Sequence, residues 1–96
     1  MVLSHKHLRI QGKVQGVGFR QNAFILATKL GLKGWVKNTR EGDVEIVVQG
    51  EDSSVLLFAE WCHEGPIHSV VRSVVVLESR EIADCEFTYF TIENTS

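Results

Sequence analysis

The sequence lacks the features that mark membrane-spanning, disordered and disulfide-stapled chains. Its 96 residues include one proline and two cysteines. No apolar run approaches the roughly 20 residues that a membrane helix needs. Charged residues make up 23% and hydrophobic residues 44%, proportions that favour a folded globular chain. A chain of this length forms one hydrophobic core, so we expect a single domain over residues 1–96.

An excess of positive charge is also missing. Ten lysine and arginine residues stand against twelve aspartate and glutamate residues, which gives a net charge of −2. Small nucleic-acid-binding proteins usually carry a basic excess, and the strand-like stretches 7–11 and 44–49 offer no aromatic residue for base stacking. We expect no nucleic-acid partner.

Residues 1–9 lack the apolar stretch of a signal peptide, so we expect a cytoplasmic monomer without a membrane partner.

The cysteines and histidines do not form a pattern typical of metal or redox sites. Cys62 and Cys85 have neither zinc-ligand nor redox-motif spacing. Two reduced thiols are expected in a cytosolic protein, and a disulfide between them is the alternative. His5 and His7 alternate with Lys6 and could face one way from a strand, but no third ligand accompanies them. We therefore expect neither a metal nor another cofactor.

Hydrophobic periodicity predicts a strand, a helix, two strands, a second helix, a strand and a short extra strand. The strands alternate apolar and polar residues or are rich in β-branched residues, and both helices carry apolar stripes at i, i+3, i+4 and i+7. This order is typical of the α+β class with a ferredoxin-like βαββαβ (split-βαβ) fold, in which two helices cover one face of an antiparallel sheet. The predicted strands are 7–11, 33–39, 44–49, 70–77 and 87–92, and the helices begin at Arg20 and after a cap at Asp52 or Ser53.

The glycine-rich stretch from Gly12 to Arg20 (GKVQGVGFR) indicates where chemistry takes place. It lies between the first strand and the first helix, and glycine allows the positive φ angles that turn backbone amides into a concavity. Such amides at a helix N-terminus bind anions. The guanidinium of Arg20 can hold two phosphate oxygens at once. A tight connection without function is the alternative, and the arginine at the helix start favours a phosphate site over it.

Two better-known phosphate motifs are absent from this loop. The P-loop of nucleotide hydrolases requires Gly-Lys followed by Ser or Thr, whereas Gly18 is followed by Phe19 and Arg20. The dinucleotide-binding fingerprint requires a third glycine where Gln21 stands. The loop therefore indicates a phosphate site of another kind.

Two blocks of the sequence resemble the acylphosphatase family. The first is the loop from Gly12 to Arg20, and the second is Leu30 to Asn38 (LGLKGWVKN), followed by Gly-Asp-Val-Glu at 42–45. Their spacing matches as well, and the likeness runs from about residue 8 to residue 50. The second half agrees only in pattern, and Ile67 replaces the second proline of a Gly-Pro-Pro sequence that the family usually has, remote from the chemistry.

The resemblance implies a hydrolase that cleaves the carboxyl–phosphate anhydride of small acyl phosphates without a metal. It implies that Arg20 and five loop residues bind the phosphoryl group, and that the side-chain amide of Asn38 positions the attacking water. A non-catalytic phosphate or carbamoyl-phosphate binding module is the alternative, since a related domain begins the longer hydrogenase-maturation proteins. The five loop residues are Gln15, Gly16, Val17, Gly18 and Phe19.

These residues suffice for the implied reaction. The leaving carboxylate is the base of an acid with a pKa of about 4–5, so no general acid has to protonate it. Phosphoryl transfer passes through a loose transition state that is stabilised mainly by positioning and charge. Asparagine is no base at neutral pH, so we expect it to orient the water, whose proton passes to a phosphoryl oxygen. Phosphate monoesters, with their poor leaving groups, are expected to react far more slowly.

Overall fold

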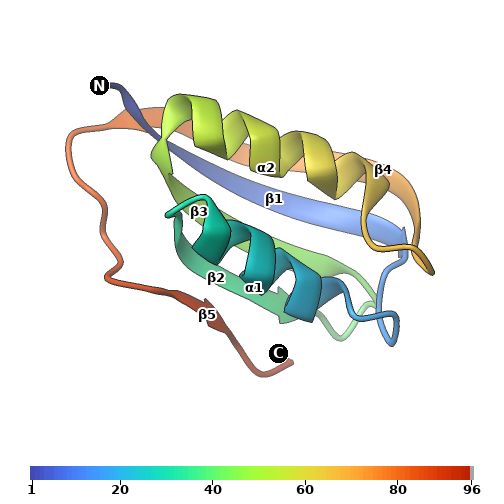
Figure 1. The fold of residues 1–96 in the computed structure, drawn as a ribbon. Coiled ribbons are helices and arrows are strands. Elements are labelled where there is room, and N and C mark those ends of the chain that lie inside the picture. Colours follow the sequence, from blue (N-terminus) through green and yellow to red (C-terminus); the bar gives the residue numbers. More distant parts are fainter. Residues whose placement is uncertain (96) are drawn as a thin grey trace.

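The computed structural model describes residues 1–95 and contains the predicted elements in the predicted order (Figure 1). The first and fourth strands are longer than predicted, because they pair with each other from Leu3 and Ile82 to Lys13 and Val70. The predicted cap of the second helix was wrong, since Glu51 occupies that position without a side-chain hydrogen bond. The elements are β1 (Leu3–Lys13), α1 (Phe19–Lys29), β2 (Lys33–Asn38), β3 (Val44–Glu51), α2 (Asp52–Glu64), β4 (Val70–Ile82) and β5 (Phe90–Ile92).

The strands form one five-stranded sheet in the order β4-β1-β3-β2-β5, and both helices pack on the same face of it (Figure 1). The first four strands pair antiparallel, but β5 pairs parallel to β2. The sheet is therefore mixed, because the extra strand of the expected fold joins the antiparallel sheet in parallel. The chain crosses from the β4 edge of the sheet to the β2 edge before it enters β5, and this path sets the direction of the last strand.

The hydrophobic core fills the space between the two helices and the sheet. Each fully buried aliphatic side chain there stabilises the fold by roughly 1.5–3 kcal/mol. Cys62 is buried on the inner face of α2, as predicted, and burial raises the pKa of its thiol far above the ordinary value. Both cysteines are free thiols. The core includes Leu8, Ile10, Val36, Val44, Ile46 and Val48 from the sheet and Phe19, Ala23, Ala27, Val55 and Phe58 from the helices.

Gly34 lets β2 lie close against β3. Its φ is 134°, and a Cβ atom at this position would lie 2.0 Å from the carbonyl oxygen of Val47. Any larger residue would therefore push the two central strands apart.

We expect Gly34→Ala to destabilise the protein more than Gly42→Ala. Both positions have positive φ outside the common regions, which costs an L-residue roughly 1–3 kcal/mol. Nothing lies within 4 Å of a Cβ built at Gly42, so only the Gly34 variant adds the clash with Val47 to the cost of positive φ. Urea denaturation of both variants measures it, and equal losses of unfolding free energy would contradict the close approach.

A polar network holds the loop between β4 and β5 against the sheet face that the helices leave open. Gln49 is fully buried, and its Oε1 accepts a hydrogen bond from the backbone N–H of Glu86 at 2.7 Å. Because that N–H can only donate, the Gln49 amide has one orientation, in which Nε2 donates to Glu86 Oε1 at 2.7 Å and to His5 Nδ1 at 2.9 Å. In this arrangement Nδ1 of His5 is the acceptor, and the Nε2–H group of His5 donates a hydrogen bond to Oε1 of Glu78 at 3.0 Å.

Glu86 makes the stability of this network depend on pH. Hydrogen bonds from Gln49 and Arg80 lower the pKa of its carboxyl. A group whose pKa is lowered by folding adds stability above its unfolded pKa, about 4.3 for Glu, and loses it as pH falls through the folded value. We expect Glu86→Gln to lower stability at neutral pH and to flatten the loss of stability on the acid side. Urea denaturation across acid pH tests this, and parallel pH profiles of the two proteins would contradict it.

Candidate active site

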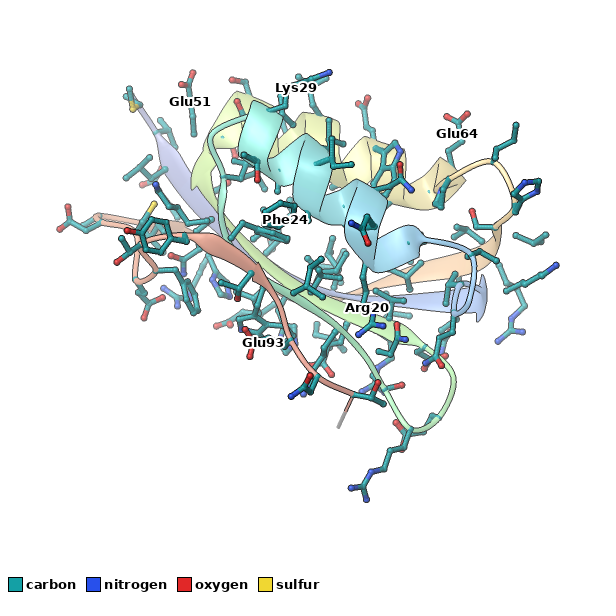
Figure 2. The ribbon with its side chains drawn as sticks, turned by 60° about the horizontal axis from the view of Figure 1, so that its bottom comes forward. Arg20, Phe24, Lys29, Glu51, Glu64 and Glu93 are labelled. Atoms are coloured by element: carbon teal, nitrogen blue, oxygen red, sulfur yellow. The ribbon has the colours of Figure 1, made fainter. Side chains whose placement is uncertain are left out.

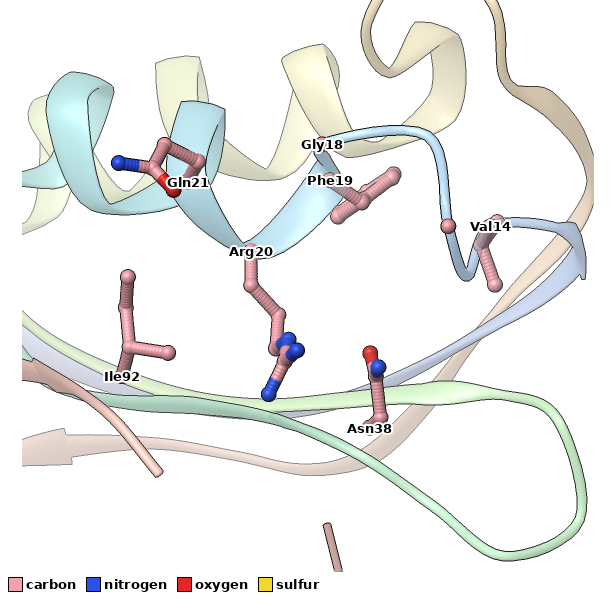
Figure 3. A pocket seen from close by; sticks show the side chains of 8 residues that line it. Val14, Gly18, Phe19, Arg20, Gln21, Asn38 and Ile92 are labelled. Atoms are coloured by element: carbon pink, nitrogen blue, oxygen red, sulfur yellow. The ribbon is translucent and has the colours of Figure 1, made fainter. Parts of the chain in front are cut away.

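The loop between β1 and α1 faces the end of β2 across a pocket of about 160 Å³ (Figure 3). Three of the five predicted loop residues line this pocket, together with the predicted arginine and the predicted asparagine. One arginine and no acidic residue are among the lining residues, so the pocket has a positive electrostatic character. The lining consists of Val14, Gly16, Gly18, Phe19, Arg20, Gln21, Asn38 and Ile92.

The N-terminus of α1 is not neutralised by acidic or capping side chains. Gly16 and Gly18 take left-handed conformations, with φ angles of 72° and 78°, and so bend the loop sharply into the helix. Gly18 is the N-cap, which leaves the first turn without a side-chain cap, and no acidic residue follows in that turn. By contrast, α2 begins with Glu51 and Asp52. The free amides at the start of α1 therefore favour an anion from outside the chain.

Arg20 extends from the first turn of α1 into the pocket (Figure 3). Its Nη1 donates to the backbone carbonyl of Glu93 at 3.3 Å, in the segment after β5 (Figure 2). The backbone N–H of Glu93 in turn donates to the carbonyl of Val36 in β2 at 2.8 Å. The C-terminal segment thus holds the guanidinium over the end of β2.

Asn38 reaches the same pocket from the last position of β2 (Figure 3). Alternation along a strand places it on the same face as Val36, which is fully buried in the core under the helices. Asn38 lies two residues beyond Val36 along the strand, where the core ends and the pocket begins. The polar amide and the Arg20 guanidinium therefore point into one space.

The side chains of the other predicted loop residues present no polar group to the pocket. Phe19 is buried, with its ring centroid 5.1 Å from that of Trp61, and Val17 packs against the core. The Gln15 side chain turns toward the hairpin that joins β2 to β3. These residues can offer only their backbone amides to a ligand in the pocket, which is the part of them that was expected to bind phosphate.

Three pocket residues were not predicted. Val14 and Gln21 flank the glycine-rich loop in the sequence, and their proximity to it was the available signal. Ile92 enters the pocket only because β5 pairs parallel beside β2. No local pattern in the sequence carries that information.

The histidine pair considered as metal ligands forms contacts with acidic side chains instead. His5 lies 3.0 Å from Glu78, and His7 lies 2.6 Å from Glu45. Within residues 1–95, no three His, Cys, Asp or Glu side chains come together in a way that could hold a metal ion. The same residues include no helix long and apolar enough to cross a membrane.

Comparison with known sequences identifies the family. The sequence model of the acylphosphatase family matches residues 6–92. The chain belongs to the acylphosphatase family. It is 46% identical over 90 residues to an acylphosphatase of Marinobacter nauticus, which covers 94% of this chain and 96% of that protein. An acylphosphatase of Thermococcus kodakarensis is 50% identical over 70 residues, or 73% of this chain and 77% of that protein.

Solved structures of acylphosphatases share the fold. The enzyme of Coxiella burnetii superimposes with a TM-score of 0.84 at 38% identity, covering 96% of this chain and 94% of that one. The Bacillus subtilis acylphosphatase gives 0.82 at 34% identity, with 95% and 98% covered. Full-length HypF, in a phosphate- and nucleotide-bound form, gives 0.81 at 32% identity, but this chain covers 12% of it. The predicted family, the ferredoxin-like fold and the hydrolase class, acting on small acyl phosphates, are confirmed.

Proposed function

We propose that this acylphosphatase-family enzyme hydrolyses acyl phosphates by attack of one water molecule on a phosphoryl group bound in the pocket. The amides of residues 15–19 and the Arg20 guanidinium bind the phosphoryl oxygens, and Asn38 orients the water. The observation that carries the proposal is the convergence of Arg20 and Asn38 on one pocket, at a helix N-terminus that no acidic or capping side chain neutralises.

Phosphate binding follows from the charges of the pocket. An acyl phosphate brings negative charge to a site that holds a permanently protonated guanidinium and the positive end of α1. The planar fork of Arg20 matches two oxygens of the phosphoryl group. These groups bind the ground state, and they bind the transition state more tightly, because they are preorganised around the equatorial oxygens over which the charge of the loose transition state is spread.

Asn38 supports the chemical step by orientation. Its side-chain oxygen accepts a hydrogen bond from the water and so aims a water lone pair at phosphorus. The new P–O bond forms as the bond to the acyl oxygen breaks, and the electron pair of that bond leaves on the carboxylate. The water proton passes to a phosphoryl oxygen, so the products are a carboxylate and inorganic phosphate. No step requires a side-chain base, a side-chain acid, a metal or a cofactor.

The leaving group provides the test of this mechanism. We expect rapid hydrolysis of benzoyl phosphate by the purified protein in excess chelator, and very slow hydrolysis of an aryl or alkyl phosphate monoester under the same conditions. The site supplies no acid to protonate an alkoxide, whereas a carboxylate leaves unaided. Comparable rates for the two substrates, or loss of activity in chelator, would contradict the mechanism.

A non-catalytic module that binds phosphate or carbamoyl phosphate is the second candidate, and the likeness to a segment of HypF supports it. Such a module would bind phosphate and leave benzoyl phosphate intact. The presence of Asn38 in the pocket favours the enzyme, because an uncharged amide adds little to anion affinity but can orient water.

We further propose that the chain works as a single-domain monomer in the cytoplasm. The proposed mechanism uses Arg20, Asn38 and the loop of this chain and needs no residue of a second copy, and two free thiols suit a reducing compartment. Light scattering at assay concentrations should give the mass of one chain, with specific activity independent of protein concentration. A dimer mass, or activity that rises with concentration, would contradict the monomer.

A further inference from the structure

We propose that the side chain of Gln15 is a positioning residue that sets the distance between the phosphate-binding loop and Asn38. The inference rests on the water-orienting role proposed for Asn38. It concerns the side-chain amide of Gln15 and is separate from the phosphate contact proposed for its backbone N–H.

The Gln15 amide bridges two carbonyl groups of the hairpin that joins β2 to β3. Its Nε2 donates to the backbone oxygen of Thr39 at 2.8 Å and to that of Asp43 at 2.8 Å. A primary amide has two N–H donors, so both are used on this one hairpin. Thr39 directly follows Asn38, which places the anchor one residue from the proposed water-orienting group.

The hairpin that accepts these hydrogen bonds from Gln15 is also closed by hydrogen bonds within itself. The N–H of Thr39 donates to the Asp43 carbonyl at 2.9 Å, and the N–H of Asp43 donates to the Thr39 hydroxyl at 3.1 Å. Gly42 also donates to the Thr39 carbonyl at 3.2 Å. Thr39 is 3% exposed, so this closure is shielded from water. A turn with these internal hydrogen bonds moves as a rigid unit, and the Gln15 side chain connects that unit to the phosphate-binding loop.

This arrangement connects the two halves of the proposed mechanism. The loop from 15 to 19 fixes the phosphorus atom, and the end of β2 fixes the water. The two segments belong to different parts of the fold, and the Gln15 side chain joins them directly beside the pocket. A misplacement of about 1 Å between reacting groups can lower a rate about 100-fold, so such a connection governs turnover more than substrate binding.

The test is a double-mutant cycle between Gln15 and Asn38. Gln15→Met keeps the length of the side chain and removes both donors, and Gln15→Ala is a second variant with the same loss. We expect either to lower kcat on benzoyl phosphate about 10- to 100-fold while the Ki of inorganic phosphate stays within about twofold of wild type. In the Asn38→Ala background the same changes should lower kcat by less than about twofold, because no oriented water remains to be misplaced.

Gln11→Glu is the matched control. Gln11 lies near the end of β1, and its Oε1 accepts a hydrogen bond from Ser73 at 2.7 Å, a bond that a carboxylate also accepts. We expect this variant to keep the wild-type kcat and Ki. The preserved phosphate Ki of the Gln15 variants also shows that they are folded.

Three results would overturn the positioning role of Gln15. They are an unchanged kcat in both Gln15 variants, an equal loss in the wild-type and Asn38→Ala backgrounds, and a Ki for phosphate that rises in step with the loss of kcat. Each of these leaves the role of Asn38 intact. Full turnover by Asn38→Ala alone would instead refute the proposed function, so the two failures are distinguishable.

Discussion

Asn38→Ala is expected to lower kcat on benzoyl phosphate by about 10²- to 10³-fold, the usual cost of one preorganised hydrogen-bonding group in a transition state. Phosphate affinity should remain at the wild-type value. The reason is that Asn38 faces the pocket from the end of β2, while the loop and Arg20 hold the phosphoryl group from the other side. The loss therefore falls on the chemical step.

Steady-state kinetics with inorganic phosphate as a competitive inhibitor separates the two effects. Asn38→Asp is the informative companion, because it keeps the shape of the side chain and adds a negative charge beside the bound phosphate. We expect it to lower kcat and also to weaken phosphate binding. Near-normal turnover by Asn38→Ala would remove asparagine from the mechanism, and a large rise in its Ki would assign it to anion binding instead.

Arg20→Ala is expected to abolish phosphate binding and activity together, with kcat/KM lower by about 10³- to 10⁵-fold, the range found for arginines that stabilise phosphoryl transfer. Among the residues that the structure describes, Arg20 is the one charged side chain that lines the pocket. Its guanidinium donates a hydrogen bond to the carbonyl of Glu93 at 3.3 Å, which favours a position at the pocket before the substrate arrives. Arg20→Lys keeps the charge and loses the planar fork, and we expect it to recover only part of the phosphate affinity.

Isothermal titration with inorganic phosphate and kinetics with benzoyl phosphate measure both losses. Arg72→Ala is the control, because it removes the same charge from an exposed position on β4. It should behave as wild type in both measurements. Phosphate binding by Arg20→Ala with wild-type affinity would show that the loop amides suffice, and it would contradict the role of the guanidinium.

Local sequence patterns predicted the core of the fold, because its residues follow the periods of helix and strand. Ala23 and Ala27 recur on one helix face, and Ile46 and Val48 alternate in a strand. The spacing of these apolar residues was enough to predict that they are buried. The outer ends of β1 and β4 were missed, since polar pairs such as Lys6 and Ser79 join them there. Such pairs carry no hydrophobic period.

The candidate site was predictable to the extent that it is built from local chemistry. The glycines and Arg20 are adjacent in the sequence, and a strand followed by a helix brings them to one end of the sheet. Two features of the site depend on tertiary structure. They are the position of Ile92 in the pocket and the hydrogen bonds from Gln15 to the hairpin after Asn38. Glutamine side chains have no preferred partner in the sequence, so that contact became visible only in the structure.

The central claim is that water attacks phosphorus in this pocket, and the fate of the water oxygen tests it most directly. Benzoyl phosphate is hydrolysed by the wild-type protein in water enriched in heavy oxygen, in excess chelator, and both products are analysed by mass spectrometry. The account predicts that the label enters inorganic phosphate and that benzoate stays unlabelled, because the P–O bond of the anhydride breaks. Label in benzoate would mean attack at the carbonyl carbon, and it would contradict the roles assigned to Arg20 and Asn38.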